Sequence, residues 1–145
     1  MRKTEAKDAE QILRFLNRYY VENQEIMPME IDFDLEDTWT FLNRAFQHPE
    51  LISYISDDGI IMGEITQPWF SKTPVARGLV WYVSPKARNG ILARSLLRAF
   101  DKEAQERGAK FSRMDFDNPA HLQMIDPFIR LMGYEDFSKV YLKRF

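Results

Sequence analysis

Residues 78–100 have the sequence GLVWYVSPKARNGILARSLLRAF, and the rest of the chain is arranged around them. Residues 79–83 form a continuous apolar run, rich in Val and aromatic residues, which predicts a central strand covered on both faces. Pro85 cannot donate to a β-ladder, so the strand is expected to end there. Apolar residues then recur at the spacing of one helix face, namely Leu92, Ala93, Leu96, Leu97 and Phe100. A strand that turns tightly into an amphipathic helix is therefore expected.

The turn between that strand and that helix has the character of an anion site. A tight strand-to-helix turn exposes the first N–H groups of the helix, and the helix dipole favours negative charge there. Arg88 and Arg94 flank these groups, and Arg98 follows one turn later. We therefore expect a phosphate-bearing ligand at the start of the helix. Because strand, turn and helix are a common unit of α/β domains, the spacing alone also leaves a purely structural role open.

Composition limits the classes of protein to consider. The chain has 145 residues, 45% hydrophobic and 29% charged, as expected of one folded domain over residues 1–145. The net charge of −2 gives no indication of binding to nucleic acid or to an anionic membrane. The chain has no cysteine, which excludes disulfides and thiol nucleophiles, and no metal site is expected. The charged N-terminus and the lack of a long apolar run predict a cytoplasmic protein.

The remainder of the chain predicts helices and strands in a definite order. Helices are expected to start at Asp8, Asp34 and Asn118-Pro119, in addition to the helix after the central strand. Asp58-Gly59 predicts a hairpin turn. Strands are expected at the very start of the chain and over residues 51–56, 60–66, 75–83, 110–116 and 137–145.

This order and three motifs resemble the GNAT superfamily of N-acetyltransferases over nearly the whole chain. In that family a strand ending Val-x-Pro is followed by Arg/Gln-x-x-Gly-x-Gly/Ala and a helix with x-x-Leu-Leu, matched here by Val83, Pro85, Arg88, Ala93, Leu96 and Leu97. Asn118 and the Gly133-Tyr134 pair match two further marks. The short chain is also similar to GNAT proteins of bacteriophages. The resemblance implies a mixed α/β (α+β) fold, in which about four helices flank a mostly antiparallel sheet of six to seven strands with splayed central strands.

The resemblance also implies that the chain binds acetyl-CoA, or another acyl-CoA, as cosubstrate. The pantetheine arm would lie where the two central strands part and would pair with exposed backbone. An N–H group of the central strand, that of Tyr82 or Val83, would stabilise the oxyanion of the tetrahedral intermediate. The pyrophosphate would bind to the N–H groups that start the next helix. The residues expected to bind the cosubstrate are Trp81, Tyr82, Val83, Arg88, Asn89, Gly90, Ile91, Leu92, Ala93, Arg94, Ser95 and Asn118.

The acceptor would be an amine, which must lose a proton before it attacks the thioester. Glu64 is the first candidate for the base because it interrupts an apolar strand, although a solvent-facing carboxylate would also explain it. Tyr82 and Tyr134 are the next candidates, with packing as the alternative role of both rings. The family often places a tyrosine acid where this chain has Ile129.

Two functions follow from the resemblance. The first is an acyl-CoA-dependent N-acyltransferase that transfers acetyl to a small-molecule or protein amine in a ternary complex, with neither nucleic acid nor membrane as partner. The second is a GNAT-fold protein that binds CoA or a partner without turnover, which Ile129 and Ile91, in place of the first loop glycine, would favour. The last expected strand is apolar on both faces and could pair in a homodimer. A nucleotide-binding enzyme is not indicated, because the chain has no Gly-Lys-Ser/Thr loop and no Gly-x-Gly-x-x-Gly.

Overall fold

A computed structural model describes residues 1–24, 32–116, 119–139, 141, 143 and 145 of the chain. The strands and α-helices follow in the order β1 (Arg2–Lys3), α1 (Ala9–Asn23), α2 (Leu35–Gln47), β2 (Leu51–Ser56), β3 (Gly59–Thr66), β4 (Val75–Val83), α3 (Ile91–Glu106), β5 (Phe111–Met114) and α4 (Pro119–Leu131). Short 3-10 helices over Ala6–Asp8 and Pro85–Ala87 precede α1 and α3. None of the described helices is both long enough and apolar enough to cross a membrane.

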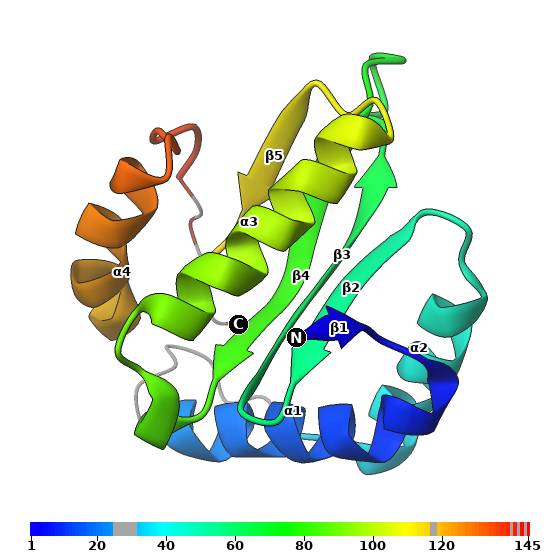
Figure 1. Cartoon of the computed structure of the whole chain (residues 1–145), viewed down its shortest axis with the longest axis vertical. Coiled ribbons are helices and arrows are strands. Elements are labelled where there is room, and N and C mark those ends of the chain that lie inside the picture. The colour runs from blue at the N-terminus through cyan, green and yellow to red at the C-terminus, as the bar shows by residue number, and fades with distance from the viewer. Residues whose placement is uncertain (25–31, 117–118, 140, 142, 144) are drawn as a thin grey trace.

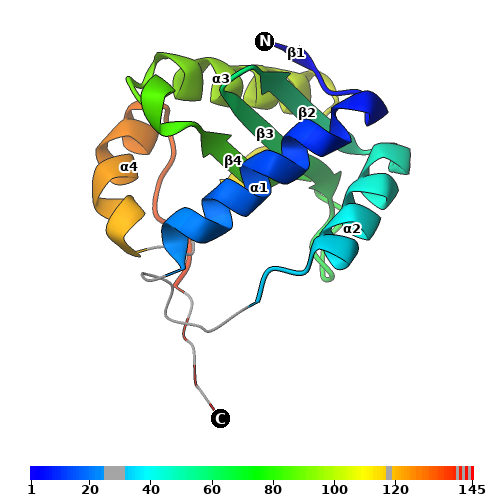
Figure 2. The ribbon, with the colours of Figure 1, turned by 90° about the horizontal axis from the view of Figure 1, so that it is seen from below.

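The helices cover both faces of one sheet (Figure 1). The strands lie in the order β1-β2-β3-β4-β5, and every neighbouring pair is antiparallel except β4 and β5, which are parallel. Figure 2 shows α1 and α2 on one face, with α3 on the other and α4 near the start of α3. Each face has its own core, centred on Phe100 and Leu96 under α3 and on Ile12 and Leu42 under α1 and α2. The structure therefore confirms the mixed, mostly antiparallel fold, with four α-helices in the described part of the chain.

The number of strands is smaller than the sequence predicts. The described residues contain five strands, not six to seven. The strand expected over residues 137–145 falls partly outside the described residues, and the described residues within it are not in a strand. Phe137 and Tyr141 there are 88% and 86% exposed. Alternating apolar residues form a strand only beside a partner strand, and the described part of the chain offers these residues none.

β4 and β5 part next to a β-bulge in β4. The register between β3 and β4 pairs Met62 with Val80 but Gly63 with Gly78, so Leu79 is an extra residue on β4. Parallel pairing with β5 covers β4 only from Val75 to Gly78. Beyond the bulge, β4 therefore continues to its end with no strand of the described chain on the β5 side. This arrangement confirms the splayed central strands.

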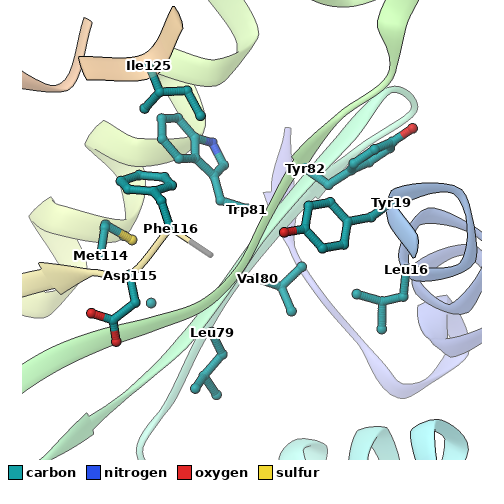
Figure 3. Close-up of a pocket in the computed structure, with 11 residues that line it drawn as sticks. Leu16, Tyr19, Leu79, Val80, Trp81, Tyr82, Met114, Asp115, Phe116 and Ile125 are labelled. Carbon is teal, nitrogen blue, oxygen red and sulfur yellow. The ribbon is translucent and has the colours of Figure 1, made fainter. Parts of the chain in front are cut away.

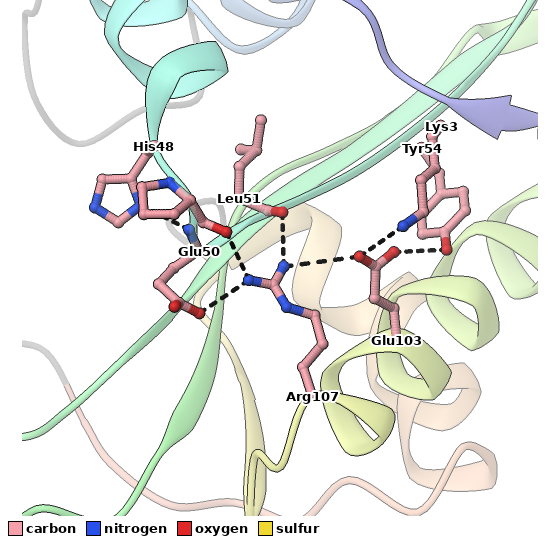
Figure 4. A network of polar contacts seen from close by, with 8 residues as sticks. Lys3, His48, Glu50, Leu51, Tyr54, Glu103 and Arg107 are labelled. Carbon is pink, nitrogen blue, oxygen red and sulfur yellow. Dashed lines mark hydrogen bonds and ion pairs between the residues drawn. The ribbon is translucent and has the colours of Figure 1, made fainter.

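A polar network joins the C-terminal end of α3 to the strands β1 and β2 (Figure 4). Arg107 donates to the carbonyl oxygen of Leu51 at 2.9 Å and is paired with the Glu50 carboxylate, also at 2.9 Å. One turn earlier, Glu103 accepts hydrogen bonds from Lys3 at 2.9 Å and from the Tyr54 hydroxyl at 2.7 Å. Because backbone and charged side chains are tied together here, the network fixes the axis of α3 against the sheet. The position of its N-terminal end beside β4 follows from this.

We expect Gly63→Ala to lower the free energy of unfolding by about 1–3 kcal/mol, the usual range for overpacking. A Cβ at Gly63 would lie 2.2 Å from the carbonyl oxygen of Arg77 and 2.7 Å from the Phe100 ring, and neither can move freely. Gly78→Ala is the matched control, because its Cβ would meet the flexible end of Met114. Urea unfolding measures both variants, and a Gly63→Ala variant as stable as the wild type would contradict the packing at the bulge.

Candidate functional site

A cavity of about 210 Å³ lies along the side of β4 that β5 leaves uncovered (Figure 3). Leu16 and Tyr19 of α1 form part of its wall on one side of β4. Met114 and Phe116, at the end of β5, and Ile125 of α4 contribute on the other side. The parting of the strands thus produces a mostly apolar cavity with a strand backbone along it.

The backbone of β4 offers hydrogen-bonding groups to this cavity at alternate residues. The Ser84 N–H donates to the carbonyl oxygen of Asp58 at 2.7 Å, so the backbone polar groups of Ser84 face the β2–β3 hairpin. In an antiparallel ladder the direction alternates, which turns the N–H of Tyr82 toward β3 and those of Trp81 and Val83 toward the open side. Of the two oxyanion donors that the sequence proposes, the N–H of Val83 is therefore the better placed.

The loop before α3 leaves several backbone N–H groups without a partner at the start of the helix. Gly90 immediately precedes α3 and has a φ of 84°, in the left-handed region that glycine adopts readily. The Ile91 N–H donates to the Asn89 side-chain oxygen at 3.1 Å. The N–H groups of Arg88, Asn89 and Arg94 donate hydrogen bonds to backbone carbonyl oxygens. Within the described part of the chain, no hydrogen bond is made by the N–H groups of Gly90, Leu92 and Ala93. These three donors are directly available to an anion.

The side chains of this loop are less available than its backbone. The Arg88 Nε donates to the carbonyl oxygen of Val83 at 2.8 Å, and its guanidinium is ion-paired with Glu22 of α1. The Ser95 hydroxyl donates to the carbonyl oxygen of Ile91 at 3.0 Å. The Arg94 guanidinium lies 6.0 Å from the centre of the Phe128 ring, near the start of α3. Asn118, the remaining predicted cosubstrate residue, lies outside the described residues.

The hydroxyl groups of the two candidate catalytic tyrosines have partners away from the cavity. The Tyr82 hydroxyl donates to Glu22 at 2.7 Å and points away from the cavity in Figure 3. Burial, with the Glu22 carboxylate beside it, raises the pKa of Tyr82 to about 12. The Tyr134 hydroxyl lies 2.6 Å from the Asp101 carboxylate and 2.7 Å from Ser112, and burial raises its pKa strongly. Both rings fit the packing role that the sequence leaves open.

Glu64 lies outside the cavity wall. It is partly buried and stands opposite Arg77 in the register of β3 and β4. By the alternation of side chains along β3, it shares the face of Met62, which α1 and α2 cover. Ile129, at the position of the tyrosine acid that the resemblance implies, is 8% exposed and packs in the core under α3.

Sequence reasoning missed two polar residues of the cavity, Tyr19 and Asp115. Figure 3 shows the Tyr19 hydroxyl directed toward β4. Asp115 is the one carboxylate among the described lining residues, and it accepts from Arg113 at 2.9 Å and lies 3.9 Å from Arg77. Tyr19 is indistinguishable in sequence from the other residues of an apolar helix face, and Asp115 from any polar residue at a strand end. Only the parting of the strands brings the two together.

No group of three or more His, Cys, Asp or Glu residues within the described ranges could hold a metal ion. The polar side-chain groups that line the cavity among the described residues are the Tyr19 hydroxyl, the Trp81 ring N–H and the Asp115 carboxylate.

Solved structures of acetyltransferases share this fold. An aminoglycoside N-acetyltransferase AAC(6')-Iy in complex with CoA superimposes with a TM-score of 0.75 at 16% identity, over 99% of this chain and 91% of that one. A "predicted acetyltransferase" with acetyl-CoA from Clostridium acetobutylicum gives 0.76 at 18% identity, over 99% and 94%. The aminoglycoside 6'-N-acetyltransferase AAC(6')-IG from Acinetobacter haemolyticus gives 0.73 at 14%, over 99% and 96%. No protein-family model and no curated protein sequence matches the chain. The likeness shows that the chain has the GNAT acetyltransferase fold.

The Tyr82–Glu22 contact predicts a pH-dependent difference in stability. The folded-state pKa of Tyr82, about 12, lies above its ordinary value of 10.0, so the stabilisation by the neutral hydroxyl is complete below about pH 10 and is lost toward pH 12. We expect Tyr82→Phe to lower the free energy of unfolding by about 1–2 kcal/mol at pH 8, because Glu22 loses a buried donor. The difference should shrink at pH 11. Urea unfolding at both values, with Tyr20→Phe as control, checks this; a loss of equal size at pH 11 would contradict the contact.

Proposed function

We propose that the chain is an acyl-CoA-dependent N-acyltransferase that transfers acetyl from acetyl-CoA to an amine by direct attack in a ternary complex. The observation that carries the proposal is the parting of β4 and β5 next to unpartnered N–H groups at the start of α3. Neighbours in fold that were solved with CoA or acetyl-CoA support an acyl-CoA as cosubstrate. Neighbours named aminoglycoside N-acetyltransferases support a small-molecule amine as acceptor.

In this proposal the pantetheine arm lies along the open side of β4 as an added strand would. Its amide groups pair with the backbone of Trp81 and Val83, and the mostly apolar walls of the cavity enclose its alkyl segments. The pyrophosphate lies on the free N–H groups of Gly90, Leu92 and Ala93, where the dipole of α3 favours negative charge. Arg94 adds positive charge at the same end of the helix.

The transfer then needs a base and an oxyanion donor. The acceptor ammonium gives one proton to the base, and its neutral nitrogen attacks the thioester carbonyl. The C–S bond then breaks as the amide forms, and the second proton of the nitrogen passes to the departing thiolate. Asp115 is our first choice for the base because it lies in the cavity wall, and Glu64 becomes the second. The N–H of Val83 is the proposed donor to the oxyanion. Tyr82 and Tyr134 keep packing roles, since their hydroxyls are bonded elsewhere.

Binding without turnover is the second candidate function. Ile91 is 70% exposed on the loop where the family has a glycine, and Ile129 is buried where the family often has a tyrosine acid.

A cytoplasmic location, a single domain, a homodimer, and an acceptor other than nucleic acid or membrane lipid also belong to the proposal, and the sequence alone supports them.

Ligand-dependent stability tests the cosubstrate. Acetyl-CoA at about a hundred times its dissociation constant should raise the free energy of unfolding by about 2.7 kcal/mol. Urea unfolding with and without millimolar acetyl-CoA measures this, and no stabilisation would contradict the proposal. Thiol release from acetyl-CoA in the presence of polyamines, amino sugars and peptides then separates the two functions. Release with an amine supports the transferase, and binding without release on this panel supports the second candidate.

A proline substitution tests the proposed anion site. Ala93→Pro removes an N–H that has no partner inside α3, and proline is tolerated in the first turn of a helix, so the fold should persist. We expect the variant to bind CoA about tenfold more weakly, as for the loss of one charge-assisted hydrogen bond. Ala93→Gly is the matched control, because it changes the same side chain and keeps the N–H. Calorimetric titration with CoA compares them, and equal affinities would place the pyrophosphate elsewhere.

A further inference from the structure

A cluster of three side chains connects α1, β4 and the loop before α3. Glu22 near the end of α1 accepts a hydrogen bond from the Tyr82 hydroxyl at 2.7 Å and is ion-paired with Arg88. The Arg88 guanidinium carbon lies 5.6 Å from the centre of the Tyr82 ring. The side chains of Arg88 and Glu22 are 34% and 26% exposed, so the pair is largely shielded from solvent. Their orientation is therefore held by three contacts at once.

Arg88 binds a backbone carbonyl oxygen that a ligand along β4 would need. The carbonyl oxygen of Val83 faces the open side of β4, and the Arg88 Nε donates to it at 2.8 Å. An extended ligand that pairs with β4 as an added strand would direct its own N–H to that carbonyl. A carbonyl oxygen has two lone pairs, and Arg88 already uses one of those on the acceptor that the ligand would approach.

Glu22 stabilises Arg88 in the orientation that binds the Val83 carbonyl oxygen. Its carboxylate is anchored to β4 through Tyr82, so it cannot follow the arginine into the loop without breaking that hydrogen bond. It also neutralises the Arg88 charge, which would otherwise act on a phosphate at the start of α3. Removing the carboxylate would release Arg88 in both respects.

We propose that Glu22 is a positioning residue that holds Arg88 on the Val83 carbonyl until the cosubstrate displaces it. The inference rests on the proposed function, because the competing ligand is the acyl-CoA. Once displaced, Arg88 can turn to the pyrophosphate, the role that the sequence predicts for it. In this way α1, which also lines the cavity, sets the affinity of the cosubstrate loop.

A double-mutant cycle on CoA affinity tests this inference. Glu22→Gln keeps the shape and the hydrogen bond to Tyr82 but removes the charge, and we expect it to bind CoA about tenfold more tightly, a coupling within the range for residues in contact. In an Arg88→Ala background the same substitution should leave the affinity within about twofold. Glu10→Gln removes the same charge near the other end of α1 and is the matched control, with no change expected. Calorimetry gives the affinities, and circular dichroism shows whether each variant is folded.

The outcomes are distinct. Weaker binding by Glu22→Gln would mean that the pair prepares the loop for the ligand and would overturn the inference. Tighter binding of equal size in the Arg88→Ala background, or in Glu10→Gln, would reduce the effect to general charge and would overturn it as well. A wild-type protein that binds no CoA would overturn the proposed function itself, which the other two outcomes leave intact.

Discussion

The extra residue at Leu79 is the constraint on which the remainder of the site depends. Before it, β4 pairs with both neighbouring strands; after it, β4 pairs only with β3 within the described chain. Unpaired backbone groups next to a cavity are unfavourable when they are shielded from water, and a ligand that pairs with them removes that penalty. The bulge thus creates both the space and the hydrogen-bonding groups for an extended ligand, without any catalytic side chain.

The position of α3 makes this space useful. At its C-terminal end, Arg107 and Glu103 tie the helix to β1 and β2, and the close approach of Phe100 to Gly63 fixes its height over the sheet. The N-terminal end is therefore held beside the open part of β4. Just after the left-handed Gly90, the N–H groups of Leu92 and Ala93 make no hydrogen bond within the described chain. One rigid helix thus aligns the proposed anion site with the gap in the sheet.

The fold could be predicted from sequence because its elements are encoded locally. Each local pattern predicts one element: the apolar run before Pro85 a strand, the helical spacing after it a helix, and Asp58-Gly59 a hairpin turn. The order of these elements matches the observed fold. The strand expected over residues 137–145 needed a partner that local pattern does not reveal. The resemblance predicted backbone features of the site, such as the parting of β4 from β5. It did not predict which side chains line the cavity or which partners they bind.

Those details depend on contacts between distant segments. Arg88 is adjacent to the anion site in sequence, yet its side chain turns to Glu22, which lies on a different helix. Asp115 and Tyr19 meet in one cavity only because the sheet opens between them. Neither pattern nor spacing carries this information, so the side chains of a site are harder to predict than its backbone.

Amide hydrogen exchange of β4, measured residue by residue with and without CoA, tests the central claim most directly. If the ligand pairs with the open side of the strand, the N–H groups of Trp81 and Val83 should gain protection, while that of Tyr82, already directed to β3, should change little. Bound CoA that leaves the exchange of Trp81 and Val83 unchanged would contradict the account.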